Sequence, residues 1–326
     1  MTYRASALKA LATTAIAASG TWAVAYARAR RAEKMFPPQG DFVEVDGVPV
    51  HYVRAGSGPE VVLIHGASGN LRDFTFDFFG RLSRRFTVTA FDRPGLGYTG
   101  RPAGYSGSNG VRGESPVEQG AFLRAAAARL GIERPVVAGH SFGGIVALGW
   151  ALGDLDAGGK AEAAAVVSLA GVALPWPGDL SPYYTVNGSE LGRITIPLLS
   201  AYVPAKFVRD RIASTFRPQD APDGYERHIG ARLVLRPESF RANIRQVNSL
   251  RPYVVEMERR YGELRLPIEL VHGTEDGTVP IDVHARPFAA RFGASLMELP
   301  GVGHMPHHTA PEACVTAVEN AVRRSR

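Results

Sequence analysis

Short runs of hydrophobic residues recur along the chain, separated by stretches of helical character. The first two runs flank Asp46 and Gly47, a dipeptide typical of hairpin turns. The later runs are mostly apolar throughout, as is usual for strands buried on both faces of a sheet. Because helical stretches separate the runs from the third onward, the pattern predicts an α/β fold with an eight-stranded, mostly parallel sheet flanked by helices. The eight predicted strands are 42–45, 50–53, 61–64, 86–91, 136–138, 165–169, 268–271 and 296–299.

One of the intervening helices has clear signals at both ends. Ser115 is a good N-cap, Pro116 suits the first turn, and Glu118 completes a capping box three residues after the serine. An alanine-rich run follows, and Gly131 is a favourable stop. The sequence therefore predicts a helix from about residue 116 to residue 130.

The first 40 residues differ from the rest of the chain. Residues 10–26 carry no charge and are rich in alanine, and basic residues flank them on both sides. We interpret residues 10–26 as a single-pass membrane anchor of undetermined orientation, followed by a Pro-Pro linker at 37–40. A cleaved signal peptide and an alanine-rich soluble helix are alternatives. The basic cluster at 28–31 disfavours cleavage and export.

The distribution of charge argues against a nucleic-acid-binding surface, and the cysteine content excludes a fold held by internal disulfides. Residues 1–40 hold six basic residues against one acidic residue, which leaves only +1 of the total charge of +6 for residues 41–326. The main part of the chain is therefore nearly neutral and has no evident basic face for nucleic acid. Cys314 is the only cysteine, so the chain cannot contain an internal disulfide. We expect Cys314 to pack as a small apolar residue.

The most specific chemical signal surrounds Ser141. Residues 139–143 read GHSFG, between a predicted strand and a helical run. This is the G-x-S-x-G pattern, in which a tight turn exposes the serine hydroxyl above the sheet and the glycines leave room for the neighbouring backbone. Asp276 and His304 follow in that order, each just after a later predicted strand. The carboxyl ends of parallel strands lie at one edge of a sheet, so we expect the three side chains to converge.

Four segments together resemble the α/β-hydrolase superfamily. They are HGA at 65–67, DRPGLG at 92–97, GHSFGG at 139–144, and the two loops that carry Asp276 and His304. The resemblance runs from about residue 42 to the C-terminus and is weak in the middle. It implies an α/β-hydrolase fold in which Ser141 is the nucleophile, His304 the general base and Asp276 the residue that orients the histidine. Glu275 is the rival for the last role, but the family pattern His-Gly-x-x-Asp selects Asp276.

The same resemblance implies an oxyanion hole and a cap. The oxyanion donors would be the backbone N–H groups of Phe142 and Ala67. The alternation of strands and helices lapses from residue 173 to residue 264, where prolines and aromatic residues are frequent. Relatives insert a helical cap after the sixth strand, so we expect a cap at 173–264 on a core of 41–172 and 265–326. Several arginines lie in this stretch, but none is singled out as a substrate ligand.

These features predict a serine hydrolase that cleaves an ester or related acyl bond of a small, apolar substrate without a cofactor. Epoxide hydrolases and haloalkane dehalogenases are disfavoured, because they place aspartate where Ser141 stands. Carbon–carbon bond hydrolases and cofactor-free haloperoxidase-like enzymes keep the serine and remain open. A ligand-binding protein without catalysis and a membrane scaffold are further alternatives.

The remaining polar residues of the motifs receive structural interpretations. We expect Asp92 to shape its loop, and His65 and His272 to hold loops by hydrogen bonds. His307 and His308 follow a proline and are expected to be solvated or to begin a helix. No spacing of histidine, cysteine or acidic residues indicates a metal site.

Overall fold

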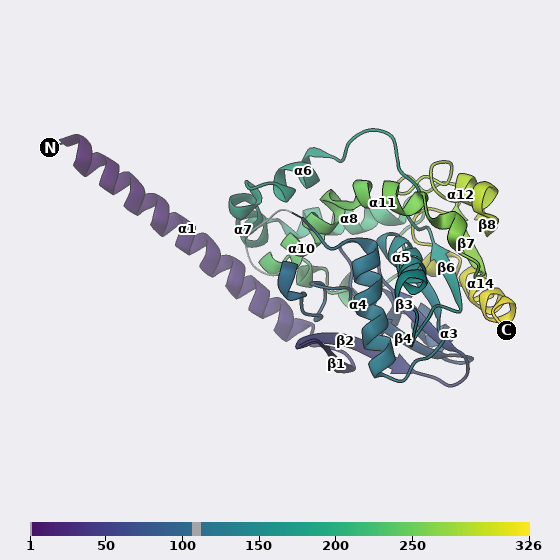
Figure 1. Cartoon of the computed structure of the whole chain (residues 1–326). Coiled ribbons are helices and arrows are strands. Elements are labelled where there is room, and N and C mark those ends of the chain that lie inside the picture. Colours follow the sequence, from purple (N-terminus) through teal and green to yellow (C-terminus); the bar gives the residue numbers. More distant parts are fainter. Residues whose placement is uncertain (1, 106–111) are drawn as a thin grey trace.

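A single twisted sheet of eight strands forms the centre of the molecule (Figure 1). The computed structural model describes residues 2–105 and 112–326, with side chains from residue 18 onward. The spatial order is β1-β2-β4-β3-β5-β6-β7-β8. The strands are β1 (Asp41–Val45), β2 (Val48–Ala55), β3 (Glu60–Ile64), β4 (Thr87–Phe91), β5 (Val136–His140), β6 (Ala165–Leu169), β7 (Ile268–Gly273) and β8 (Ser295–Leu299). All eight predicted strands are present, so the predicted fold class is confirmed.

The direction of the strands places the candidate residues at one edge. β1 and β2 form the predicted antiparallel hairpin around Asp46, and β2 pairs antiparallel with β4. Every later pairing, from β3–β4 to β7–β8, is parallel. The carboxyl ends of β3, β5, β7 and β8 therefore open on the same side. The loops after them carry Ala67, Ser141, Asp276 and His304.

Helices cover both faces of the sheet and create two hydrophobic cores. In β3, Val62 and Ile64 face the core under α4 and α5, whereas Val61 and Leu63 face the core under α3 and α14. This alternation on a doubly covered strand explains its continuous apolar run. The helices of the main domain are α2 (Arg72–Thr75), α3 (Phe78–Leu82), η1 (Ala103–Tyr105), α4 (Pro116–Arg129), α5 (Phe142–Ala157), α12 (Ala285–Phe292), α13 (Pro306–Thr309) and α14 (Pro311–Arg324).

The end signals of α4 act as the sequence predicted. Ser115 Oγ accepts a hydrogen bond from the Glu118 N–H, and the Glu118 carboxylate accepts one from the Ser115 N–H. Pro116 occupies the first turn. Cys314 is fully buried on α14, among apolar side chains, as expected.

The described segment between β6 and β7 contains only helices and loops. These helices are α6 (Pro182–Gly188), α7 (Gly192–Tyr202), α8 (Ala205–Phe216), α9 (Tyr225–His228), η2 (Ala231–Leu233), α10 (Pro237–Asn248), α11 (Leu250–Glu258) and η3 (Tyr261–Glu263). They gather on one side of the sheet in Figure 1. We propose that residues 173–264 are the cap that the sequence predicts.

The N-terminal residues form a long helix, α1 (Thr2–Met35), which projects from the body of the molecule (Figure 1). Its C-terminal half contacts neighbouring helices, with Ala25 and Ala32 buried and Glu33 paired at 3.2 Å with Arg236, the residue before α10. Among the residues that the structure describes, no helix has both the length and the apolar character needed to span a bilayer. The predicted membrane anchor at 10–26 was therefore wrong, because alanine and threonine make this uncharged stretch only weakly apolar.

The predicted linker after α1 is held by hydrogen bonds. The Pro37 carbonyl accepts from Arg72 at 2.6 Å, and the Phe36 carbonyl accepts from the Tyr98 hydroxyl at 2.6 Å. Gln39 also contacts Thr75 and His51. These contacts fix the path of the chain from α1 into the sheet.

Candidate active site

Ser141 occupies the turn between β5 and α5 in a strained backbone conformation. Its φ of 54° and ψ of −118° lie outside the regions that residues with a side chain normally adopt. The turn is tight enough that a side chain on Gly139 would clash with the Gly143 carbonyl, and one on Gly143 would clash with the Ile64 carbonyl. The two glycines of the motif are therefore required by neighbouring backbone, as predicted for a turn that exposes the serine.

The three predicted side chains are connected by hydrogen bonds. Nε2 of His304 lies 2.9 Å from Oγ of Ser141, and Nδ1 of His304 lies 2.8 Å from Oδ2 of Asp276. Since the carboxylate can only accept, Nδ1 carries the proton and Nε2 is free to accept from the serine hydroxyl. All three residues are at least nine-tenths buried. This arrangement can transfer a proton from Ser141 to His304.

Asp276 is fixed by more than its histidine. Its Oδ1 accepts hydrogen bonds from the backbone N–H groups of Thr278 and Val279, both at 2.8 Å. Burial raises the pKa of this carboxyl, but hydrogen bonds from His272, His304 and the Val279 N–H outweigh it and hold the pKa well below its usual range. The rival Glu275 is exposed to solvent. The geometry thus brings Asp276, and not Glu275, to the histidine.

The two predicted oxyanion donors flank the serine. Phe142 is the first residue of α5, and Ala67 lies in the loop after β3. That loop backs onto the nucleophile, since a side-chain carbon on Gly66 would lie 3.1 Å from Cβ of Ser141. Within the described part of the chain, neither N–H donates a loop or side-chain hydrogen bond. Both are therefore available to a developing negative charge.

Asn243 of α10 belongs to this site, although the sequence did not identify it. Its Oδ1 accepts from the Ser68 N–H at 2.6 Å, and its Nδ2 donates to the Ser68 hydroxyl at 2.9 Å. Asn243 is buried, and Ser68 has a positive φ of 54°. The segment between β6 and β7 (residues 173–264, the inserted segment) thereby holds the loop that carries Ala67. No spacing rule connects residues 175 positions apart, so the sequence contained no signal for this contact.

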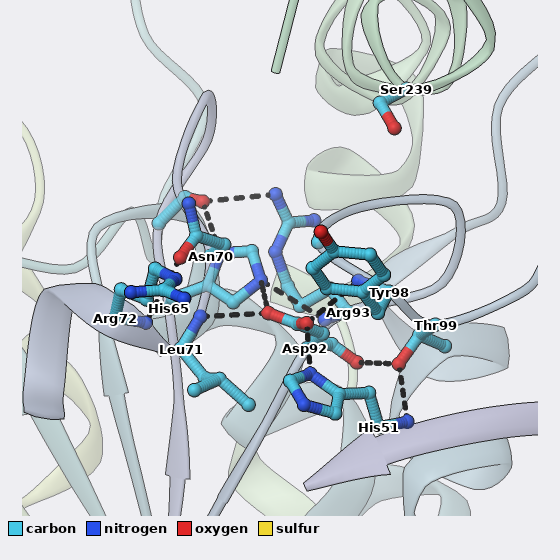
Figure 2. A network of polar contacts seen from close by, with 12 residues as sticks. His51, His65, Asn70, Leu71, Arg72, Asp92, Arg93, Tyr98, Thr99 and Ser239 are labelled. Atoms are coloured by element: carbon cyan, nitrogen blue, oxygen red, sulfur yellow. Dashed lines mark hydrogen bonds and ion pairs between the residues drawn. The ribbon is translucent and has the colours of Figure 1, made fainter. Parts of the chain in front are cut away.

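A polar network around Asp92 supports the same loop (Figure 2). Asp92 Oδ1 accepts from the Leu71 N–H at 2.7 Å, and Oδ2 accepts from the Tyr98 N–H at 2.8 Å and from His51 Nδ1 at 2.6 Å. Both ring nitrogens of His51 face oxygen acceptors, because Nε2 contacts the Gln39 carbonyl. With its oxygens occupied in this way, Asp92 has the loop-shaping role that the sequence suggested.

His65 and Arg93 continue the network toward the serine. The Arg93 N–H donates to His65 Nε2 at 3.0 Å, so the proton on Nδ1 is directed to the Gly66 carbonyl at 2.8 Å. Burial and the charge of Arg93 lower the pKa of His65 to about 4, which keeps the ring neutral. The Arg93 guanidinium contacts the Gly66 carbonyl and lies 4.3 Å from the centre of the Phe142 ring. Arg93 thus bridges the two segments that hold the predicted oxyanion donors.

The structure decides between the two expectations for His307 and His308. His272 holds a loop, as predicted, through Nε2 and the Val279 carbonyl at 2.7 Å. His307 and His308 do belong to a helix start, in α13, but they are not solvated. Both side chains are fully buried and contact Asp73 of α2. The sequence could not show this, because the partners are more than 230 residues apart.

Asp73, His307 and His308 are also the one group among the described residues whose ligand atoms converge as a metal site would require, all within 4.8 Å of one another. Sequence spacing gave no sign of this group. Its contacts are already hydrogen bonds, with His308 Nε2 at 2.8 Å and His307 Nε2 at 3.1 Å from the carboxylate. N–H groups at Nε2 of the two rings, which donate to the Asp73 carboxylate, therefore explain why the three side chains lie so close together.

Comparisons with known proteins agree with this architecture. An uncharacterized protein of Mycobacterium tuberculosis is 27% identical over 292 residues, which covers 87% of this chain and 81% of the relative. An alpha/beta hydrolase fold protein from Burkholderia ambifaria superposes with a TM-score of 0.66 at 25% identity, covering 86% of this chain and 97% of its own. A structure described as a membrane phospholipase A gives a TM-score of 0.66 at 20% identity and covers 100% of this chain and 99% of its own. This last likeness shows the fold alone.

The sequence model described as "Alpha/beta hydrolase family" matches residues 61–317. This range includes the Ser141 turn and both loops that carry Asp276 and His304. The match covers most of the chain, and the sheet order agrees with it. The chain therefore belongs to the alpha/beta hydrolase family.

Proposed function

We propose that this protein is a serine hydrolase that cleaves an ester or related acyl bond through an acyl-enzyme intermediate. The observation that carries the proposal is the pair of short contacts from His304, 2.9 Å to Ser141 Oγ and 2.8 Å to Asp276 Oδ2. A serine hydroxyl is a poor nucleophile at neutral pH and needs a base within hydrogen-bond reach. The His304 ring, with its Nδ1 proton directed to Asp276, is oriented to be that base.

In the first half-reaction, Ser141 Oγ attacks the carbonyl carbon of the substrate while its proton passes to His304 Nε2. The imidazolium that forms is stabilised by the buried Asp276 carboxylate. The negative charge that develops on the carbonyl oxygen is stabilised by the N–H groups of Phe142 and Ala67. When the tetrahedral intermediate collapses, His304 Nε2 returns the proton to the leaving group.

The second half-reaction repeats these steps with water. His304 Nε2 takes a proton from the water as its oxygen attacks the acyl carbon, and the same two N–H groups stabilise the oxyanion. Collapse releases the acid and returns the proton to Ser141 Oγ. Each proton in this cycle moves between Ser141, His304 and the reactants, so the steps need no cofactor.

We propose an apolar, ester-like substrate. Hydrophobic residues of the inserted segment, including Tyr184 and Trp176, pack on the same core as Phe142. We include a phospholipid among the candidate substrates, because one structural neighbour, which covers 100% of this chain, is described as a membrane phospholipase A. No single arginine of the segment is assigned to the substrate.

The test is turnover of p-nitrophenyl esters of increasing acyl length, and of a short-chain phospholipid, by the full chain and by Ser141→Ala. We expect hydrolysis that is lost in the variant, with the preferred acyl length reporting the size of the pocket. A folded protein that turns over none of these esters would instead favour a carbon–carbon bond hydrolase or a cofactor-free haloperoxidase-like enzyme. Ligand binding that Ser141→Ala leaves unchanged, without turnover, would favour a non-catalytic protein.

A further inference from the structure

A cluster of buried polar side chains lies directly behind His304 and takes no part in the mechanism above. Its centre is Asp73 of α2, which is 4% exposed. The Asp73 carboxylate contacts the Tyr225 hydroxyl at 2.8 Å, His308 Nε2 at 2.8 Å and His307 Nε2 at 3.1 Å. The cluster therefore joins α2 to α9 and to α13, the short helix that begins two residues after His304.

The pattern of donors determines where the protons are. A carboxylate only accepts hydrogen bonds, so Tyr225, His307 and His308 donate to Asp73, and each histidine carries its proton on Nε2. Nδ1 of His307 and Nδ1 of His308 are buried and have no partner in the described part of the chain. Burial lowers the pKa of His307 to about 4 and so keeps this ring neutral. No arginine or lysine among the described residues forms an ion pair with Asp73, so these three donors are its direct stabilising contacts.

His140 connects the cluster to the catalytic residue. Its Nε2 lies 2.9 Å from the backbone carbonyl of His304, and since a carbonyl accepts, the proton is on Nε2. Its Nδ1 lies 3.8 Å from Asp73 Oδ2 and has no hydrogen-bond partner. The His140 ring also packs between the rings of His304 and His307, with centroids 4.9 and 4.5 Å away.

His304 is thus held from two directions, one through α13 to Asp73 and one through His140, whose ring lies beside Asp73. Its carbonyl is bound by His140, the residue before the nucleophile, and the chain two positions beyond it is bound to Asp73 through α13. A shift of the His304 backbone would move Nε2 relative to Ser141 Oγ, and displacements of about 1 Å at such contacts cost about 100-fold in rate. Among the described residues, the side chains of Asp73, His307 and His308 form no hydrogen bond with Ser141, Phe142 or Ala67, so their side-chain contacts lead to the site through His304.

We infer that Asp73 is a positioning residue for the proposed hydrolase: through His307, His308 and the adjacent His140 it fixes the backbone of His304 so that Nε2 points at Ser141. This inference rests on the proposed function. It predicts a defect in the chemical step with little effect on substrate binding, because the contacts of the cluster lead to the backbone around His304, which carries the general base.

The first variant to test is Asp73→Asn in the full chain. Its amide keeps the size of the carboxyl group but presents an NH2 group to histidine N–H donors, which breaks part of the network. We expect kcat, and the rate at which a fluorophosphonate labels Ser141, to fall at least about tenfold, with KM within about twofold and labelling still reaching completion. The matched control is Asp77→Asn, which makes the same charge change at the N-cap of α3, where the carboxylate is half-exposed and pairs with Arg81; we expect it to behave as the wild type.

A second pair of variants decides the matter if Asp73→Asn does not fold. His308→Gln retains an N–H donor near the position of Nε2, whereas His308→Ala removes it. We expect the alanine variant to lose kcat and the glutamine variant to recover most of it. A merely structural role would lower the folded fraction, and hence the number of labelled sites, without slowing the sites that remain.

Three outcomes would overturn the inference. The first is wild-type kcat and labelling rate in folded Asp73→Asn. The second is equal kcat for the two His308 variants. The third is a stoichiometric metal in the purified wild type that Asp73→Asn lacks, which would make the cluster a metal site. Failure of the proposed function looks different, because the wild type itself would then show neither turnover nor labelling.

Discussion

The side chain of Asn243 binds both the backbone N–H and the hydroxyl of Ser68, at 2.6 and 2.9 Å. Ser68 is in a positive-φ conformation and directly follows Ala67, whose N–H is a proposed oxyanion donor. One end of this contact belongs to α10 of the inserted segment and the other to the loop after β3. The segment between β6 and β7 therefore takes part in shaping the loop after β3.

Replacing Asn243 with alanine removes both contacts and leaves the Ser68 N–H without its buried acceptor. We expect kcat to fall by about 10- to 100-fold, because the Ala67 N–H is no longer held toward the oxyanion. Steady-state kinetics of Asn243→Ala beside Glu238→Ala measures this, since Glu238 is exposed on the same helix. Equal activity of the two variants would contradict the assigned role of Asn243.

Asp276 and Glu275 are adjacent, but only Asp276 contacts His304. Asp276→Asn replaces the acceptor of the Nδ1 proton with an amide and favours the wrong tautomer of the ring. By analogy with the serine-protease triad, we expect kcat to fall by about 10⁴-fold. Glu275→Gln, an equivalent change at an exposed side chain, should leave kcat within about twofold. If the two variants were affected in the reverse order, the assignment of Asp276 would be wrong.

Two glycines at the start and near the end of α5 allow a controlled test of the Ser141 turn. A side chain on Gly143 would meet backbone carbonyls, whereas the nearest atom to a side chain on Gly153 is 3.7 Å away. We expect Gly143→Ala to lower the free energy of unfolding by about 3 kcal/mol or more. Gly153→Ala should raise it by about 0.5–1 kcal/mol, because it removes flexibility from the unfolded chain. Chemical denaturation of both variants checks this, and similar stabilities would contradict the close packing of the turn.

Buried histidines should make the fold sensitive to mild acid. Burial lowers the pKa of His284 to about 4, as it does for His65 and His307. Between pH 6.5 and 4 each such ring takes up a proton only when the chain unfolds, so the free energy of unfolding falls as the pH falls. Each ring contributes a slope of up to about 1.4 kcal/mol per pH unit in this window.

The variant His284→Asn isolates one of these contributions. Asparagine can still accept from the backbone N–H groups of Ala173 and Leu174, as Nδ1 of His284 does, but it does not titrate. Denaturant unfolding measured from pH 7 to pH 4.5 should show, below about pH 6.5, a slope smaller than in the wild type by up to about 1.4 kcal/mol per pH unit. An identical slope in both proteins would show that His284 is not neutral in the fold.

The sequence was sufficient for those parts of the molecule that depend on local patterns. Period and length of the apolar runs identified all eight strands, and the capping box identified α4. Ser141, Asp276 and His304 could be predicted because each follows a strand, and parallel strands bring such positions to one edge. The hydrogen bonds from His304 to both partners agree with that reasoning.

Contacts across long separations could not be predicted in this way. Asn243, His307 and His308 acquire partners only when the inserted segment and α13 pack against the first third of the chain. In the linear sequence they look like ordinary polar residues of helices. The prediction of a membrane anchor was wrong for another reason: residues 10–26 are uncharged but only mildly hydrophobic, and no helix among the described residues combines the length and the apolar character that crossing a membrane requires.

The most direct test of the central claim is the site at which a fluorophosphonate probe reacts. The full chain is treated with the probe, and the adduct is located by mass spectrometry beside Ser141→Ala. Activation of Ser141 by His304 predicts one adduct per chain, on Ser141, and none in the variant. A folded wild type that remains unlabelled, or an adduct at another residue that persists in Ser141→Ala, would contradict a serine hydrolase mechanism at this site.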